Sequence, residues 1–181
     1  MVAVSKRAMD LLEEGKGGYY TDLKAHLKKA SKNQTPYTPA VSLFFALQEA
    51  LKMAAEEGFP ERRARMAALA GGVRAAASAL DIQLFPQVNE HTTYSNTVTA
   101  MKMPSGISDS QLRGGMRKRG VVVSGGQEGL KGKIFRIGTM GACTEADVLR
   151  TIQTLELVLE KEGVISSLGA GVEAASKAIE A

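Results

Sequence analysis

The chain has 181 residues, of which 44% are hydrophobic and 23% are charged, and its formal net charge is +4. A chain of this length can form one domain with a buried core, and these fractions are ordinary for globular proteins. No apolar run approaches the ~20 residues that a membrane-spanning helix needs, so no membrane partner is expected. The single cysteine, Cys143, excludes an internal disulfide and a zinc site built from several cysteines.

Nucleic-acid binding and metal chemistry are not favoured either. The densest basic run, RGGMRKRG at 113–120, contains no aromatic residue and suits the exposed last turn of a helix. His26 and His91 are expected to be solvated or capping residues, because two histidines offer little for a metal site or a catalytic triad. The N-terminal segment contains acidic residues and lacks the apolar core of a signal peptide, which predicts a cytoplasmic protein.

The first half of the chain is predicted to be mainly helical. It opens with a short strand, MVAV at 1–4, followed by a helix with Ser5 as its N-cap and Gly15 near its end. A glycine-rich loop then leads into a short basic helix. Apolar residues at helical spacing predict one helix from Pro39 to the EEGFP segment and a second, alanine-rich helix at about 61–80.

The second half mixes β-type runs with helices. DIQLF (81–85), SNTVTAMKM (95–103), GVVVSGG and GKIFRIGTMG are predicted strands. SDSQLRGGMRKR starts with a capping-box pattern, and TEADVLRTIQTLELVLEKEG has the strongest helical pattern, with Thr144 as its cap. The tail is alanine-rich and weakly helical. This order predicts an α+β fold in which helices cover one face of a small, largely antiparallel sheet.

Three hydroxyl-bearing residues, Thr35, Tyr37 and Thr38, lie directly before the helix predicted from Pro39. Pro39 suits the first helical position, which makes Thr38 the expected N-cap. The same helix terminus offers free backbone N–H groups and the positive end of the helix dipole, which suit a phosphate or a carboxylate. Capping and anion binding are both open from these residues alone.

Arg136 lies within a predicted strand between the apolar residues Phe135 and Ile137. An arginine in this setting either reaches water from an edge or holds a carboxylate through two hydrogen bonds. Neither a GxxxxGK[ST] nor a GxGxxG pattern is present, so the sequence gives no support to a nucleotide-binding fold.

Several segments occur together, in one order, in a single family: VSKRAMDLL, YYTDLK, QTPYTPAVSLFFALQEAL, GKIFRIGTMG and TEADVLRTIQTLE. Through them the chain resembles, over about residues 1–162, the C-terminal part of class V pyridoxal-phosphate aminotransferases. The most similar branch is the alanine/serine–glyoxylate and serine–pyruvate type. The resemblance implies the C-terminal small domain of the fold-type I pyridoxal-phosphate transferases, with long alanine-rich helices beside the sheet.

The resemblance also assigns roles to single residues. Arg136 matches the arginine that binds the α-carboxylate of the amino-acid substrate. Thr38 matches a threonine whose hydroxyl contacts the cofactor phosphate of the neighbouring subunit in a homodimer. Thr35 occupies the position of a phosphate-binding tyrosine, and Tyr37 is the nearest tyrosine, so both are further candidates for cofactor binding.

The lysine that forms the Schiff base with pyridoxal 5'-phosphate precedes the MVAV strand in this family, and Lys6 and Lys16 fall outside its position. The resemblance therefore implies no catalytic residue in this chain and no covalently bound cofactor. It implies that the N-terminal large domain is missing and that the isolated chain is inactive. Residues 1–57 would follow the lysine region, 58–162 would form the small domain, and 163–181 a helical tail.

The complete enzyme would use a small amino acid and a 2-oxo acid. The alternative is a stand-alone, non-enzymatic oligomeric α+β module, or a subunit that completes a separately encoded N-terminal half. Separation from a large domain also predicts exposed apolar faces along VSLFFAL (41–47) and self-association.

Overall fold

The computed structural model describes residues 2–12 and 18–181. The chain forms two compact units, Met1–Glu56 and Glu57–Ala181. In the part that is described, no helix is both long enough and apolar enough to cross a lipid bilayer.

The first unit begins with two short helices, α1 (Lys6–Asp10) and α2 (Leu23–Ala30). The predicted N-cap of α1 is confirmed, because the Ser5 side chain accepts a hydrogen bond from the backbone N–H of Ala8. The strand predicted at 1–4 is wrong for residues 2–4, which have no regular structure. A strand is stabilised by its neighbours, and no strand of the described first unit is there to pair with it. Met1, Gly15 and Lys16 lie outside the described residues.

Helix α3 (Val41–Glu57) starts later than the sequence predicts. The first helical hydrogen bond runs from the backbone N–H of Phe44 to the carbonyl of Ala40, at 3.2 Å. Before it, the N–H of Val41 bonds to the carbonyl of Pro39 at 2.9 Å, so a tight turn precedes the helix. The interpretation of Thr38 as the N-cap is therefore wrong, because Thr38 lies ahead of this turn and the carbonyl of Ala40 accepts the first helical hydrogen bond.

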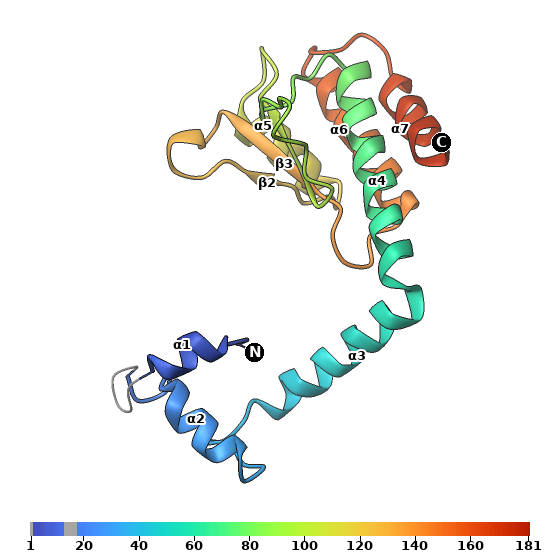
Figure 1. The fold of residues 1–181 in the computed structure, drawn as a ribbon. Helices are drawn as coiled ribbons and strands as arrows, with labels where there is room; N and C mark the ends of the chain where they lie inside the picture. The colour runs from blue at the N-terminus through green and yellow to red at the C-terminus, as the bar shows by residue number, and fades with distance from the viewer. Residues whose placement is uncertain (1, 13–17) are drawn as a thin grey trace. The chain divides into compact units, whose positions relative to one another are not determined.

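The second unit contains three long helices that lie side by side, α4 (Phe59–Ala79), α6 (Glu145–Lys161) and α7 (Ala170–Glu180) (Figure 1). The alanine-rich stripe predicted for α4 is buried. It allows a close approach to α7: a Cβ added at Gly72 would lie 2.6 Å from Cγ1 of Ile179. The tail is thus a packed helix, held by contact area along α4 and α6.

The sheet has three antiparallel strands in the order β1–β3–β2, namely β1 (Val98–Lys102), β2 (Ser124–Gly125) and β3 (Ile134–Gly138). The predicted strand at 81–85 is reduced to one bridge between Leu84 and Met101. Helix α5 (Asp109–Lys118) and the 3₁₀ turn η1 (Glu128–Leu130) connect the strands. The predicted α+β fold with a small antiparallel sheet is confirmed.

One face of the sheet packs on the helices. Strand side chains alternate between faces, and those directed toward α4 and α5 are buried, as are the apolar residues of α5 and α6. The largest fully buried side chains of this core are Phe135, Leu69, Met101, Leu112, Met116, Ile152, Leu155 and Leu159. Arg136 of β3 lies on the opposite face of the sheet.

Candidate functional site

Arg136 lies at the centre of β3, paired across the sheet with Ala100 of β1 and Ser124 of β2. Its neighbours Phe135 and Ile137 point to the helix side and are 0% and 4% exposed. Arg136 itself is half-buried on the other face. The pattern noted in the sequence, a cation between two apolar residues, thus reflects a strand with one core face and one open face.

The Arg136 side chain is held through one nitrogen. Its Nε donates a 3.0 Å hydrogen bond to the carbonyl of Gly125 in β2. Within the described ranges, 2–12 and 18–181, no carboxylate forms an ion pair with Arg136. The two terminal nitrogens are therefore available as a fork, the geometry that binds a carboxylate through two parallel hydrogen bonds.

Three other arginines of the second unit have carboxylate partners. Arg65 donates from Nε to Oε1 of Glu57 at 2.6 Å, and Arg62 donates to Oε2 of the same residue at 2.8 Å. Arg113 forms a two-point pair with Asp109, with both N–O distances at 2.7 Å. Arg136 thus differs from these three in having terminal N–H groups that can accept a new anionic partner.

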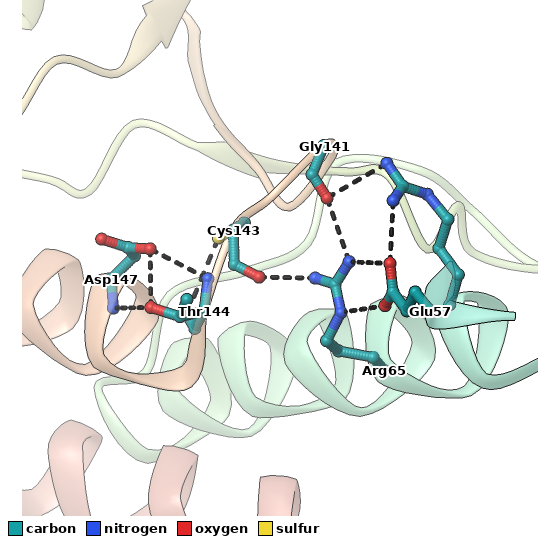
Figure 2. Close-up of polar contacts among 7 residues, drawn as sticks. Glu57, Arg65, Gly141, Cys143, Thr144 and Asp147 are labelled. Carbon is teal, nitrogen blue, oxygen red and sulfur yellow. Dashed lines mark hydrogen bonds and ion pairs between the residues drawn. The ribbon is translucent and has the colours of Figure 1, made fainter. Parts of the chain in front are cut away.

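The loop that follows β3 is fixed by the Glu57 cluster, which consists of Glu57, Arg62 and Arg65. Figure 2 shows the Arg65 guanidinium between the Glu57 carboxylate and the loop, where it donates to the carbonyls of Cys143 at 2.5 Å and Gly141 at 3.0 Å. Arg62 adds a 3.3 Å bond to the Gly141 carbonyl. The cluster ties the start of α4 to the segment that follows β3, at Gly141 and Cys143.

The capping box of α6 completes this region. The Thr144 side chain accepts from the backbone N–H of Asp147, and the Asp147 carboxylate accepts from the Thr144 backbone (Figure 2). The predicted Thr144 cap is confirmed. Hydrogen bonds from Thr144 hold the pKa of Asp147 below its usual value, and burial raises the pKa of the Cys143 thiol.

Ion pairs with arginines determine the protonation states of the carboxyl groups of Glu57 and Asp109. The hydrogen bond from Arg65, supported by Arg62, lowers the pKa of Glu57. The hydrogen bond from Arg113 lowers the pKa of Asp109 in the same way. Both carboxylates are therefore ionised at neutral pH and serve to hold arginines in place.

The hydroxyl-bearing residues of the first unit have different partners. The Tyr37 hydroxyl donates to the carbonyl of Tyr19 at 2.5 Å, and its ring stacks on Tyr20 at 5.0 Å between centroids. The Thr35 hydroxyl donates to the carbonyl of Tyr37 at 2.7 Å. Thr38 is exposed, and within the described residues its hydroxyl has no hydrogen-bond partner.

These contacts test the fit to a cofactor phosphate. The hydroxyl protons of Thr35 and Tyr37 are both used in hydrogen bonds to backbone carbonyls of the first unit. The hydroxyl of Thr38 is a free donor just before the N-terminus of α3. A groove of about 570 Å³ lies beside Thr35, but its walls are mainly apolar and do not suit a phosphate by themselves. The first unit therefore fits one hydroxyl contact to a phosphate, through Thr38.

The structure places the predicted site residues in two units: Arg136 in the second, and Thr35, Tyr37 and Thr38 in the first. It also shows residues that the sequence reading missed. The Glu57 cluster was detectable in part, because Arg62 and Arg65 are three positions apart on one helix face. Their loop partners are 76 to 79 residues away in the chain and had no sequence signal. Among the described residues, no group of histidine, cysteine, aspartate and glutamate side chains could hold a metal ion.

Comparison with known proteins decides the family. No protein-family model matches the chain. An uncharacterized aminotransferase of Methanocaldococcus jannaschii is 42% identical over 182 residues, which is 98% of this chain and 46% of that protein. A protein of Synechococcus sp. named as the small subunit of a soluble hydrogenase is 39% identical over 163 residues, 89% of this chain and 41% of that protein. A serine–glyoxylate aminotransferase of Hyphomicrobium methylovorum is 32% identical over 181 residues, 98% of this chain and 44% of that protein.

Solved structures give the same result. The pyridoxamine–pyruvate aminotransferase of Mesorhizobium loti has a TM-score of 0.86 and 28% identity, with 98% of this chain and 46% of that chain covered. The ureidoglycine–glyoxylate aminotransferase of Bacillus subtilis has a TM-score of 0.81 and 28% identity, over 90% and 42% of the two chains. This chain belongs to the aminotransferases. The chain spans about half the length of the curated relatives it matches, and its fold is that of the C-terminal part of the solved aminotransferases.

Proposed function

We propose that this chain is the C-terminal part of a class V, pyridoxal-phosphate-dependent aminotransferase. The complete enzyme would move an amino group from a small amino acid, such as alanine or serine, to a 2-oxo acid, such as glyoxylate or pyruvate. The proposal rests on the family and on relatives named as serine–glyoxylate aminotransferases, one of them 32% identical to this chain. Amino acids and 2-oxo acids share an α-carboxylate, so both half-reactions need a residue that holds this group.

The observation that supports this function most directly is the state of Arg136. Its Nε is bound to Gly125 at 3.0 Å, and its terminal nitrogens have no carboxylate partner in the described chain. In the proposed role these nitrogens bind the α-carboxylate and orient the substrate. A fork held at one end loses less rotational freedom on binding, which favours the bound state.

Thr38 is the residue proposed to contact the cofactor phosphate of a neighbouring subunit in a homodimer. Its free hydroxyl can donate to a phosphate oxygen, and the nearby N-terminus of the 17-residue helix α3 favours negative charge. Thr35 and Tyr37 would act behind it by shaping the segment, since their own protons are used in bonds to Tyr37 and Tyr19. When bound, pyridoxal 5'-phosphate supplies the electron sink for transamination.

The isolated chain is proposed to be catalytically inactive. No lysine here matches the family position that holds the cofactor, so an N-terminal large domain would have to supply it. The complete enzyme is proposed to work in the cytoplasm. A stand-alone, non-enzymatic oligomeric module, or a subunit that completes a separate N-terminal half, is the alternative and differs in what the chain binds.

The test has two parts. In the first, the purified chain is incubated with pyridoxal 5'-phosphate, alanine and glyoxylate, and pyruvate formation is followed; we expect no turnover above the cofactor alone. In the second, pyruvate is titrated into the ¹⁵N-labelled chain and the arginine side-chain signals are monitored. We expect Arg136→Gln to weaken pyruvate binding about tenfold, since it removes a two-point charged contact.

Arg117→Gln provides the matched control, because Arg117 is an exposed cation of the same unit with no ion pair in the described chain. Pyruvate binding that both variants reduce equally would reflect general charge and contradict the role of Arg136. Turnover by the chain alone would contradict the need for a separate domain. Absence of any pyruvate contact at Arg136 would favour the non-enzymatic module.

A further inference from the structure

The direction of the Arg136 side chain depends on a very short strand. Its Nε is bound to the carbonyl of Gly125, and Gly125 belongs to β2, which has two residues and pairs with β3 at only two positions. Such a short edge strand has few backbone hydrogen bonds of its own. The peptide that carries this carbonyl is held to β3 by a 3.1 Å hydrogen bond from the Gly126 N–H to the carbonyl of Ile134. A further contact packs against Gly125 from the helix side.

That contact comes from Arg113 of α5. A Cβ added at Gly125 would lie 2.9 Å from Cζ of Arg113 and 3.0 Å from its Nε and Nη2. The guanidinium thus lies directly against the glycine, on the side where any other residue would place its side chain. Nη1 of Arg113 also reaches the carbonyl of Val123 at 3.5 Å.

Arg113 is itself firmly held. Its Nε and Nη2 each donate 2.7 Å hydrogen bonds to the two oxygens of Asp109, one turn earlier in α5. The helix is anchored in the core by Leu112 and Met116, both 0% exposed. A flexible arginine could move away from an added Cβ, but one held at two points by Asp109 resists this movement.

The Asp109–Arg113 pair has a second consequence, for charge. A free guanidinium at Arg113 would offer a separate anion site on α5. Its two-point pair with Asp109 uses the fork that a carboxylate would need.

We propose that Asp109, Arg113 and Gly125 are positioning residues that aim the Arg136 guanidinium at the substrate carboxylate. The inference rests on the proposed function of Arg136 and extends it to residues that touch no substrate. Asp109 fixes Arg113, Arg113 packs on Gly125, and the Gly125 carbonyl fixes Nε of Arg136. A larger residue at 125 would place its Cβ against the Arg113 guanidinium, which would then have to shift.

The test separates aiming from binding by using two readouts on the full 181-residue chain. The first is the hydrogen-exchange rate of the Arg136 Nε–H, measured by NMR, which reports its bond to Gly125. The second is pyruvate affinity, measured by titration. We expect Arg113→Met, Asp109→Asn and Gly125→Ala each to speed the exchange and weaken pyruvate binding, by roughly three- to tenfold.

Two of the variants, Arg113→Met and Gly125→Ala, have a control close by in the chain. Arg117→Met removes an exposed cation from the same helix. Gly129→Ala adds a methyl group where no atom lies within 4 Å. We expect both controls to leave exchange and affinity unchanged. Arg113→Lys, which keeps a charge for Asp109 but loses the planar fork, should fall between wild type and Arg113→Met. Circular dichroism identifies any variant that does not fold, and Arg113→Met then replaces Gly125→Ala.

The outcomes are distinguishable. Faster exchange with weaker pyruvate binding supports both the positioning and the role of Arg136. Faster exchange with unchanged pyruvate binding supports the positioning and overturns Arg136 as the carboxylate ligand. Unchanged exchange in folded variants overturns the positioning, whatever the pyruvate affinity does.

Discussion

The carboxylate of Glu156, in α6, accepts a 2.6 Å hydrogen bond from the backbone N–H of Gly171, in the first turn of α7. Its second oxygen accepts from the N–H of Gly169 at 2.9 Å, and Glu156 is 1% exposed. The last helix has no side-chain cap of its own, since Gly169 precedes it. A buried carboxylate from a neighbouring helix therefore does the capping and complements the helix dipole.

This relationship predicts that Glu156→Gln lowers the free energy of unfolding by about 2 kcal/mol, because the neutral amide replaces a charged acceptor of two N–H bonds. Urea unfolding followed by circular dichroism measures the change. Glu160→Gln, one turn further along α6 and exposed, is the control and should change stability by less than about 0.5 kcal/mol. Equal effects of the two substitutions would contradict the capping role.

The pair of Glu57 and Arg65 predicts a smaller effect. Glu57→Gln removes the charged partner of Arg65 and Arg62 and frees the loop at Gly141 and Cys143. These side chains are 26% to 30% exposed, so solvent screens the pair and we expect a smaller loss of stability than for Glu156→Gln. Amide hydrogen exchange in the 139–144 loop should accelerate in the same variant.

Glu56→Gln is the matched control for this loss. Glu56 has a single loose contact with Lys52, at 4.0 Å and with both side chains more than 60% exposed. Its substitution should leave both stability and loop exchange unchanged. If Glu57→Gln behaves like Glu56→Gln, the cluster is a surface pair without influence on the loop.

The elements that the sequence predicted well have capping and hydrophobic patterns within their own residues. Helix α6 has its capping box and a regular apolar stripe, and α5 has Ser108 as its N-cap with both halves of its capping box formed. Strands are harder to predict, because a strand forms only when a neighbouring strand pairs with it. Residues 2–4 have no strand to pair with in the described first unit, and DIQLF (81–85) pairs with β1 at one position. The start of α3 moved because a turn at Pro39 precedes the helix.

The candidate site also contains some residues that local sequence patterns predict and others that they do not. Arg136 was found because its apolar neighbours mark a strand with one open face, a local pattern. The contact of Arg113 with Gly125 and that of Arg65 with Gly141 are tertiary, and they depend on how helices dock against the sheet. Single-sequence patterns contain no information on such distances.

Acid pH is expected to weaken the second unit through Glu57 and Asp109. The folded-state pKa of each lies below its usual value, so each contributes stability that is fully present above the unfolded pKa and is lost as pH falls through the folded pKa. The midpoint temperature of unfolding should therefore drop between about pH 5 and pH 3. The double variant Glu57→Gln/Asp109→Asn should start lower and show a flatter slope; an unchanged slope would assign the acid sensitivity to other groups.

Thr99 offers a stabilising substitution. Its side chain is 5% exposed, and its hydroxyl has no hydrogen-bond partner in the described chain. Thr99→Val removes a buried unsatisfied hydroxyl at nearly constant shape, and we expect a gain of about 1 kcal/mol in unfolding free energy. Thr154→Val is the control, since that buried hydroxyl donates to the carbonyl of Arg150 at 2.7 Å and its removal should give no gain.

The apolar surface of α3 predicts self-association of this chain. Leu43, Phe44 and Phe45 are 68%, 56% and 66% exposed, which confirms the exposure expected for VSLFFAL, and of the whole 17-residue helix only Ala54 is buried. A helix that is apolar on most sides is stable in water when another surface covers it.

At concentrations of about 100 µM, light scattering should therefore show species larger than 19.2 kDa. Leu43→Ser/Phe45→Ser should shift the chain toward the monomer, whereas Glu49→Gln, a polar exchange on the same helix, should not. A wild-type chain that stays monomeric under these conditions would contradict the prediction, because the apolar surface of α3 would then remain exposed to solvent without self-association.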